Sequence, residues 1–281
     1  MKSRIIFSVF LFCAACAVRA QARPFAEYET ARYLFMSMGG SPDMRQLQRR
    51  IIENLPPGIQ VRLYYDLYPD ADFEELQNVE YFRYDTPSLW ARDILPYAVS
   101  RLDKWTFVWP FEMPPGDFAV EFDRPLVNSD SYIAGGNLMA DSRGNCFTVD
   151  RSPVFLEKIL AQHYDCRTAT VFPEVAGIGH IDERMKILSD TEVLVDEPSF
   201  APVLRKMGYN VTMLPRPRTP YGNYSNSLLI NGVVFVPIYG EPSDEEALKI
   251  YRSFNLKVVP LDSSFLIQNK GAIHCMTMTY P

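Results

Sequence analysis

The chain has 281 residues, of which 47% are hydrophobic and 22% charged, and its formal net charge is −6. This length is sufficient for one large α/β domain with a substantial core. The negative charge argues against a nucleic-acid partner and suits a cationic one.

Residues 1–20 have the features of a secretory signal peptide. Lys2 and Arg4 form a basic start, an apolar stretch follows, and a small-residue cleavage site precedes Gln21. The stretch is too short to span a membrane, and no later run is long enough to do so. Lipoprotein processing at Cys16 is the alternative. We therefore expect an exported protein whose mature part is a single domain, residues 21–281. Removal of the leader, which carries three basic residues, leaves a net charge of −9.

Four strand–helix–strand units follow along the mature chain. In each, β-branched and aromatic runs flank a stretch whose apolar residues recur at helical spacing. Written as strand, helix and strand, the units are 33–36, 42–55 and 60–65; 146–149, 153–164 and 168–172; 192–195, 199–207 and 210–214; and 233–236, 243–254 and 256–260. Residues 97–130 contain strand-like pieces but no clear helix. We expect them to form a fifth unit that has lost its helix.

The order of the elements favours units arranged around a central axis over one doubly wound open sheet. The second strand of each unit leads into a long loop and then into another strand, which does not fit a continuous parallel sheet. Reactive side chains follow the units at comparable points, namely Asp93, His180 with Asp182, Asn226 and Cys275. An arrangement around an axis would bring these loops together.

Three cysteines remain after the leader: Cys146, Cys166 and Cys275. An odd count in an exported protein indicates one disulfide and one free thiol, although three unrelated thiols are the alternative. Cys146 lies in a predicted strand and Cys166 at the end of the following helix, so the connection can be short. We predict a Cys146–Cys166 disulfide that leaves Cys275 free.

A thiol, an imidazole and two carboxylates can together process a planar cation. Asp93 and Asp182 would hold the cation, Cys275 would attack it, and His180 would move protons. His180 is selected by elimination among three histidines. His163 lies in a predicted helix, and His274 would point away from Cys275 if that segment were extended.

Each candidate also has a structural alternative. A free cysteine is usually a small buried hydrophobe, a histidine can be structural, and an aspartate can cap a loop. A zinc site is disfavoured because no second histidine and no paired-cysteine spacing accompany the motif. A papain-like protease would need its cysteine near the mature N-terminus. We interpret Arg143, Glu183 and Arg184 as solvated or supporting groups.

Five short motifs resemble those of the Porphyromonas-type peptidylarginine deiminase family, which includes agmatine deiminases and belongs to the guanidine-modifying superfamily. The match extends over nearly all of residues 25–281, and the motifs occur in the family's order. They are WARD at 90–93, AGGN at 134–137 with Asp141 and Gly144, GHID at 179–182 with MKIL at 185–188, YSN at 224–226 with Asn231, Gly232, Val236 and Pro237, and GAIHC at 271–275.

The resemblance implies a pseudo-five-fold α/β propeller, the pentein fold, with one unit reduced. It implies hydrolytic deimination of a guanidinium through a thiouronium on Cys275, with substrate-binding roles for Trp90, Asn226, Gly136 and Asn137. No metal or organic cofactor is implied. Export favours peptidyl-arginine as substrate, with agmatine as the alternative and a catalytically inactive guanidine-binding protein as another class. Ala134 and the segment 94–96 depart from the family pattern, and the chain is shorter than typical agmatine deiminases, which leaves the substrate open. The oligomeric state is also left open.

Overall fold

A computed structural model of the chain describes residues 22–38, 40–65, 73, 75–83, 88–101, 104–109, 124–129, 131–150 and 153–281. The predicted signal peptide and Cys16 lie outside the described residues. Within the described ranges, no helix is long and apolar enough to cross a membrane.

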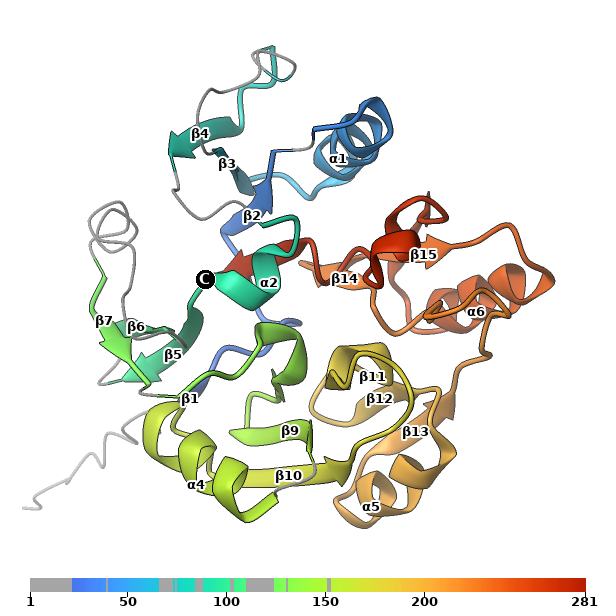
Figure 1. Cartoon of the computed structure of the whole chain (residues 1–281). Coiled ribbons are helices and arrows are strands. Elements are labelled where there is room, and N and C mark those ends of the chain that lie inside the picture. Colours follow the sequence, from blue (N-terminus) through green and yellow to red (C-terminus); the bar gives the residue numbers. More distant parts are fainter. Residues whose placement is uncertain are drawn as a thin grey trace, which may run out of the picture.

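The described strands form five separate sheets, and Figure 1 shows them around a common centre where α2 and β17 lie. The sheet orders are β17-β2-β3-β4, β1-β5-β6-β7, β10-β9-β8, β11-β12-β13 and β14-β15-β16. The strands are β1 Arg23–Pro24, β2 Tyr33–Ser37, β3 Gln60–Tyr65, β4 Val79–Arg83, β5 Tyr97–Arg101, β6 Lys104–Trp109, β7 Leu126–Asn128, β8 Met139–Ala140, β9 Asn145–Asp150, β10 Thr168–Pro173, β11 Met185–Ile187, β12 Glu192–Val195, β13 Asn210–Met213, β14 Leu228–Ile230, β15 Val233–Ile238, β16 Lys257–Asp262 and β17 Thr277–Tyr280. The helices are α1 Pro42–Asn54, α2 Ala91–Ile94, α4 Pro153–His163, α5 Ala201–Lys206 and α6 Pro242–Arg252, with 3-10 turns η2 Gly135–Asn137, η3 Ile181–Glu183, η4 Pro198–Phe200 and η5 Leu266–Asn269.

The four predicted units are confirmed, because each consists of two parallel strands joined by a helix. α1 joins β2 to β3, α4 joins β9 to β10, α5 joins β12 to β13 and α6 joins β15 to β16. Each first strand also pairs antiparallel with another strand, as β8 does with β9 and β17 with β2. The mixed α/β class is thus confirmed, and an open doubly wound sheet is ruled out by the five separate sheets.

Local sequence explains why these helices form where predicted. In α1, the Ser41 side chain accepts a hydrogen bond from the Met44 amide, and Pro42 occupies the first turn. Leu47 and Ile51, four residues apart, are both buried. The helix predicted at 199–207 differs, because a 3-10 turn precedes α5.

The fifth sheet matches the prediction in part. β5 and β6 pair antiparallel and β6 and β7 pair parallel, so residues 97–130 repeat the strand pattern of the other units. The connection between β6 and β7 falls on residues 110–123, outside the described residues. The loss of its helix therefore stays a prediction.

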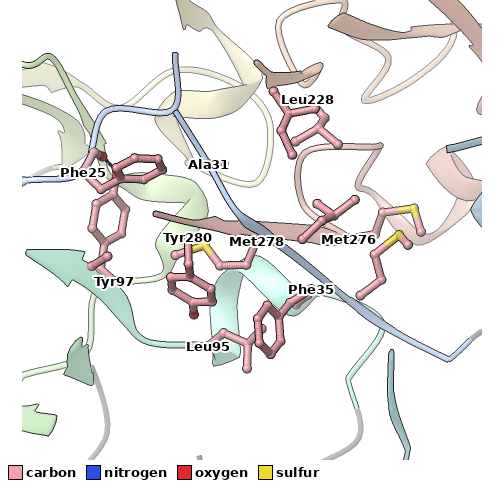
Figure 2. Packing of buried hydrophobic residues seen from close by; sticks show 14 of the residues in the cluster. Phe25, Ala31, Phe35, Leu95, Tyr97, Leu228, Met276, Met278 and Tyr280 are labelled. Carbon is pink, nitrogen blue, oxygen red and sulfur yellow. Dashed lines mark hydrogen bonds between the residues drawn. The ribbon is translucent and has the colours of Figure 1, made fainter. Parts of the chain in front are cut away.

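The packing between α2 and β17 fixes the base of the central region. Tyr280 on β17 donates a hydrogen bond from its hydroxyl to the Pro96 carbonyl at 2.8 Å, and its ring meets that of Phe35 edge-on at 5.1 Å. Leu95 joins the same buried cluster, as Figure 2 shows. These contacts hold α2, which carries Asp93, against the strand that directly follows Cys275.

The predicted disulfide is confirmed. Cys146 on β9 bonds to Cys166, which follows α4, with their Cα atoms 5.8 Å apart, and Cys275 is a free, buried thiol. The bond closes the α4 crossover onto its first strand.

Replacing both Cys146 and Cys166 by serine is expected to lower the free energy of unfolding by about 3 kcal/mol, since the closed loop has a separation of 20 residues. Denaturant titration of the oxidised protein and the double variant measures this. A reducing agent should destabilise the oxidised protein and leave the variant unchanged. Equal stability of the oxidised protein and the variant would contradict the prediction.

Candidate active site

The backbone at Gly136 is the point where three predicted site residues converge. A Cβ atom on this residue would lie 2.8 Å from His180 Nδ1, 3.1 Å from Asp182 Oδ2 and 3.2 Å from Asp93 Oδ1. The Gly136 amide donates to Asp93 Oδ1 at 3.0 Å. Glycine is therefore required here, because any side chain would fill the space that these polar groups face.

Cys275 lies in the turn before β17, next to the same carboxylates. Its Sγ is 3.6 Å from Asp182 Oδ2 and accepts a hydrogen bond from Asn226 Nδ2 at 3.1 Å. Its own amide donates to Asn226 Oδ1 at 3.2 Å. Burial, together with the negative charges of Asp182 and Asp93, raises the pKa of the Cys275 thiol well above its usual value. Without a cation in the site, the thiol form is favoured.

The two carboxylates have different surroundings. Asp182 is completely buried; its Oδ2 contacts His274 Nδ1 at 2.7 Å and its Oδ1 has no hydrogen-bond partner within the described residues. Burial acts to raise the pKa of Asp182, but the hydrogen bond and charge of His274 outweigh it and lower that pKa. Burial raises the pKa of Asp93, opposed in part by His180.

The His180 imidazole lies at the same point. Its Nδ1 lies 3.9 Å from Asp93 Oδ1 and is buried, with no hydrogen-bond partner in the described part of the chain. The preceding Gly179 has a φ of +85°, a backbone conformation that favours glycine and turns the chain into η3. The GHID motif thus directs the imidazole and the Asp182 carboxylate towards Gly136 from one short segment.

Trp90 borders the site on another side, close to the turn 273–276 that contains Cys275. A Cβ on Gly271 would come within 2.5 Å of the Trp90 ring, so the indole packs directly on the backbone there. The Arg92 amide donates to the Cys275 carbonyl at 3.1 Å. Of the residues predicted to bind substrate, Trp90, Asn226 and Gly136 therefore all adjoin the candidate site.

The Asn137 side chain makes hydrogen bonds to the backbone of two other segments. Its Oδ1 accepts from the amides of Val149 and Ile181 at 3.1 and 3.2 Å, and its Nδ2 donates to the Val149 carbonyl at 3.0 Å. This amide joins η2, β9 and η3. These bonds hold the segment that carries His180. Asn137 also lines a cavity beside His180, so its predicted substrate contact stays a prediction.

A cavity of about 370 Å³ opens beside His180. Its walls include Ile133, Ile159 and Ile178 together with Tyr132 and Phe155, whose side chains are strongly exposed. The polar residues Asn137, Asp150 and Glu174 also line the cavity, so its walls suit a ligand that has both apolar and polar groups. Within the described ranges, no group of three or more His, Cys, Asp or Glu residues is arranged to hold a metal ion.

Residues 175–281 match the model of the Porphyromonas-type peptidyl-arginine deiminase family. Over these residues the match confirms the resemblance to the family that the motifs indicated. The matched segment contains His180, Asp182, Asn226 and Cys275. No curated protein sequence matches the chain.

Solved structures extend the similarity to nearly the whole chain. An agmatine deiminase from C. jejuni superposes with a TM-score of 0.79 at 19% identity, over 92% of this chain and 96% of that one. A putative arginine deiminase from Porphyromonas gingivalis gives 0.75 at 17% identity, over 93% and 98%. DDAH from Pseudomonas aeruginosa gives 0.55 at 12% identity, over 90% and 100%. At these identities the similarity shows a shared fold, and it includes the part of the chain that carries Asp93 and Gly136.

Glu27 and its buried contacts with two motif residues were not predicted from the sequence. Glu27 precedes every motif and contacts His274 Nε2 at 2.9 Å and Lys186 Nζ at 2.6 Å. His274 was expected to point away from Cys275 on an extended strand, but residues 273–276 form a turn, and its ring supports Asp182. Lys186 and His274 lie 159 and 247 residues from Glu27 along the chain, so no local pattern could indicate these contacts.

Glu183 and Arg184 are not solvated, contrary to one interpretation of the sequence. Only 3% of Glu183 and 9% of Arg184 is exposed, and Glu183 Oε2 accepts from the Ile178 amide at 2.9 Å. Arg184 pairs with the buried Asp196 at 3.2 Å. Arg184 also donates to the Ala176 carbonyl, so both residues support the segment before His180. Arg143 is partly exposed and contacts Asp141 at 2.8 Å, as expected of a supporting group.

The burial of Glu183 predicts a pH dependence of stability. Burial, with the nearby charge of Asp182, raises its pKa from 4.5 to about 7. Between these pH values the folded state holds a proton that the unfolded state has lost, so stability falls as pH rises, by on the order of 3 kcal/mol. We expect Glu183→Gln to remove this decline.

Denaturant titrations from pH 4.5 to pH 8 measure the effect. The Gln variant should gain stability relative to the unmodified protein as pH rises, whereas Glu246→Gln, at an exposed position on α6, should track the unmodified protein. Parallel curves for the Glu183 variant and the unmodified protein would show that this carboxyl does not titrate as described.

Proposed function

We propose that the chain is a hydrolase that deiminates a guanidinium group through a covalent intermediate on Cys275. The observation that carries the proposal is the convergence of Asp93, Asp182 and His180 on the side-chain-free position at Gly136, with the Cys275 thiol 3.6 Å from Asp182. Carboxylates that face a planar cation, beside a nucleophile and a base, are the arrangement that this reaction needs.

Binding begins with the two carboxylates. A guanidinium presents paired N–H donors that match a carboxylate, so Asp93 and Asp182 would each accept hydrogen bonds from it. The buried and unpartnered Oδ1 of Asp182 supports this step, because an anionic oxygen without a partner in a dry site is costly until a cation arrives.

The bound cation would also activate the nucleophile. The negative charges that raise the pKa of Cys275 in the empty site are neutralised once the guanidinium is present. The thiol would then pass its proton to His180 in the complex, and Asn226 would donate a hydrogen bond to the resulting thiolate. Activation would thus depend on substrate and protect the resting thiol from other electrophiles.

The chemistry would proceed in two displacements. The thiolate forms a C–S bond to the guanidinium carbon, and His180 gives a proton to the departing nitrogen, so that one C–N bond breaks and ammonia leaves. His180 then removes a proton from water, whose oxygen attacks the thiouronium carbon. The C–S bond breaks, and the ureido product and the thiolate are released. One water is consumed, and the nitrogen leaves with one proton, in sum as an ammonium ion, so that the ureido product is neutral.

Peptidyl-arginine is the proposed substrate, with peptidyl-citrulline as product. The family match and the predicted leader support it, since an exported enzyme meets arginine chiefly in polypeptides. The cavity beside His180 also supports a substrate larger than a guanidinium alone. Agmatine is the second candidate, with N-carbamoylputrescine as product and putrescine biosynthesis as context. The full-length similarity to an agmatine deiminase favours it.

The finer description of the fold and location is proposed in the same way. We propose that the five sheets form a pseudo-five-fold propeller, in which residues 21–281 make one catalytic domain after export. The repeated sheet pattern supports this arrangement. It would explain why loops far apart in sequence supply Asp93, His180, Asn226 and Cys275 to one site.

A colorimetric assay of ureido product with agmatine, free arginine and arginyl peptides tests the proposal. Ureido product and ammonia should form in equal amounts from arginyl peptides, with a higher kcat/KM than from the two small guanidines. A preference for agmatine would select the second candidate. Binding of guanidines without any turnover would contradict the enzyme and support a guanidine-binding protein.

A further inference from the structure

A row of four alternating charged or ionisable side chains runs from the interior to the candidate site. Lys186 Nζ lies 2.6 Å from Glu27 Oε2, which lies 2.9 Å from His274 Nε2. The other ring nitrogen, His274 Nδ1, lies 2.7 Å from Asp182 Oδ2. The side chains of Lys186 and Asp182 are 0% exposed, that of His274 1% and that of Glu27 14%. The row is thus almost completely withdrawn from water.

The two contacts of His274 determine where its protons lie. Each ring nitrogen faces a carboxylate oxygen, and an ionised carboxylate can only accept a hydrogen bond. Glu27 accepts hydrogen bonds at both oxygens, from Lys186 Nζ and from the Leu229 amide, and Asp182 Oδ2 accepts one from the Cys275 thiol, so neither oxygen that faces the ring carries a proton. Both ring nitrogens must then donate, which requires the doubly protonated, cationic form of the imidazole.

We propose that His274 is a positioning residue, held as an imidazolium between Glu27 and Asp182, and that it orients the Asp182 carboxylate for a cationic substrate. The expected effect of His274 on substrate binding rests on the proposed deiminase function. The charge of His274 does not depend on that function.

The consequence for Asp182 follows from its two oxygens. His274 occupies Oδ2, so the carboxylate cannot rotate freely, and Oδ1 is left without a partner among the described groups. A fixed carboxylate with one free oxygen is preorganised for a donor from the substrate. A neutral ring would instead turn a lone pair towards Glu27 or Asp182, and two acceptors would repel each other.

The charges around the ring are arranged to sustain this state. Lys186 on β11 backs Glu27, while the Arg92 guanidinium on α2 donates from Nε to the His274 carbonyl at 2.9 Å. Lys186 and Arg92 oppose a cation at His274, whereas Glu27 and Asp182 favour it and make direct contact with the ring. Cys275, on the neighbouring position, contacts the same Asp182 oxygen.

Glu27 also explains how the N-terminal segment takes part in the site. Its second oxygen, Oε1, accepts from the Leu229 amide on β14 at 2.8 Å. One carboxylate therefore joins the segment between β1 and β2 to the β14 sheet, to Lys186 and to the cysteine turn. The negative charge of Glu27 stabilises the His274 ring, and its hydrogen bond to Leu229 connects two parts of the fold.

Nitrogen-15 NMR of histidine-labelled protein, without substrate, tests the proposal directly. His274 should show two protonated ring nitrogens at pH 7 and pH 8, and His274→Gln identifies its signals. Glu27→Gln should convert the ring to a singly protonated form, whereas Glu29→Gln, which neutralises a carboxylate bonded to Arg23 in the same segment, should leave it unchanged. A singly protonated His274 in the unmodified protein would overturn the proposal.

Steady-state kinetics of the variants provides a second test. Glu27→Gln should raise KM for the guanidine at least tenfold, with a smaller loss in kcat. Glu27→Asp should recover part of this loss of affinity. Glu29→Gln should have a KM within twofold of that of the unmodified protein. An unchanged KM in Glu27→Gln would overturn the positioning role. If the unmodified protein turned over no guanidine, the proposed function would fail, and the NMR result would still decide the charge of His274.

Discussion

Replacing Cys275 by alanine is expected to abolish formation of ureido product while the protein remains folded. Cys275 is the free thiol of the described chain, lies 3.6 Å from Asp182 and receives a hydrogen bond from Asn226. Without the sulfur no covalent intermediate can form, so the rate should fall by roughly four orders of magnitude or more. The colorimetric assay on purified protein measures this loss.

The expected cost to the fold is small, because a buried cysteine side chain is close to alanine in size. Near-ultraviolet circular dichroism and thermal unfolding of the variant should resemble those of the unmodified protein. Ureido formation at a normal rate by a well-folded Cys275→Ala protein would show that the reaction does not pass through this thiol.

Asp93→Asn and Asp182→Asn should each lose turnover on every guanidine tested. Each change removes a negative charge that would pair with the cation in a largely dry site. The loss should be about 3–5 kcal/mol, or two to four orders of magnitude in kcat/KM. Asp182→Asn should have the larger effect, because Asp182 is fully buried and also contacts His274 and Cys275.

Asp43→Asn is the matched control, since Asp43 is exposed in the first turn of α1 and lies outside the site. Its kcat/KM should equal that of the unmodified protein. If Asp93→Asn or Asp182→Asn also retained its kcat/KM, that aspartate would not hold the guanidinium.

Local patterns account for most of the fold. The runs at 33–36, 192–195 and 233–236 lie within β2, β12 and β15, because β-branched and aromatic residues favour strands irrespective of distant partners. The pairing of β17 with β2 joins the two ends of the described chain. Such a contact leaves no mark in either segment, and no local pattern could have indicated it.

The candidate site likewise contains residues that local motifs indicate and residues that only the fold brings together. His180, Asp182 and Cys275 lie in short motifs, so the sequence could indicate them and the geometry brings them together. Glu27 lies outside the motifs, and it meets Lys186 of the MKIL segment only through the fold. Asn137 shares a motif with Gly136, but its amide binds the backbone of Val149 and Ile181. A motif thus identifies a segment without separating residues that face a ligand from those that hold the segment.

Mass spectrometry of the protein quenched with acid during turnover tests the central claim most directly. The account predicts a covalent adduct on the peptide that contains Cys275, with the mass of the substrate less one ammonia, and no adduct in Cys275→Ala. Steady ureido formation with an unmodified Cys275 peptide at every quench time, or an adduct on another residue, would contradict it.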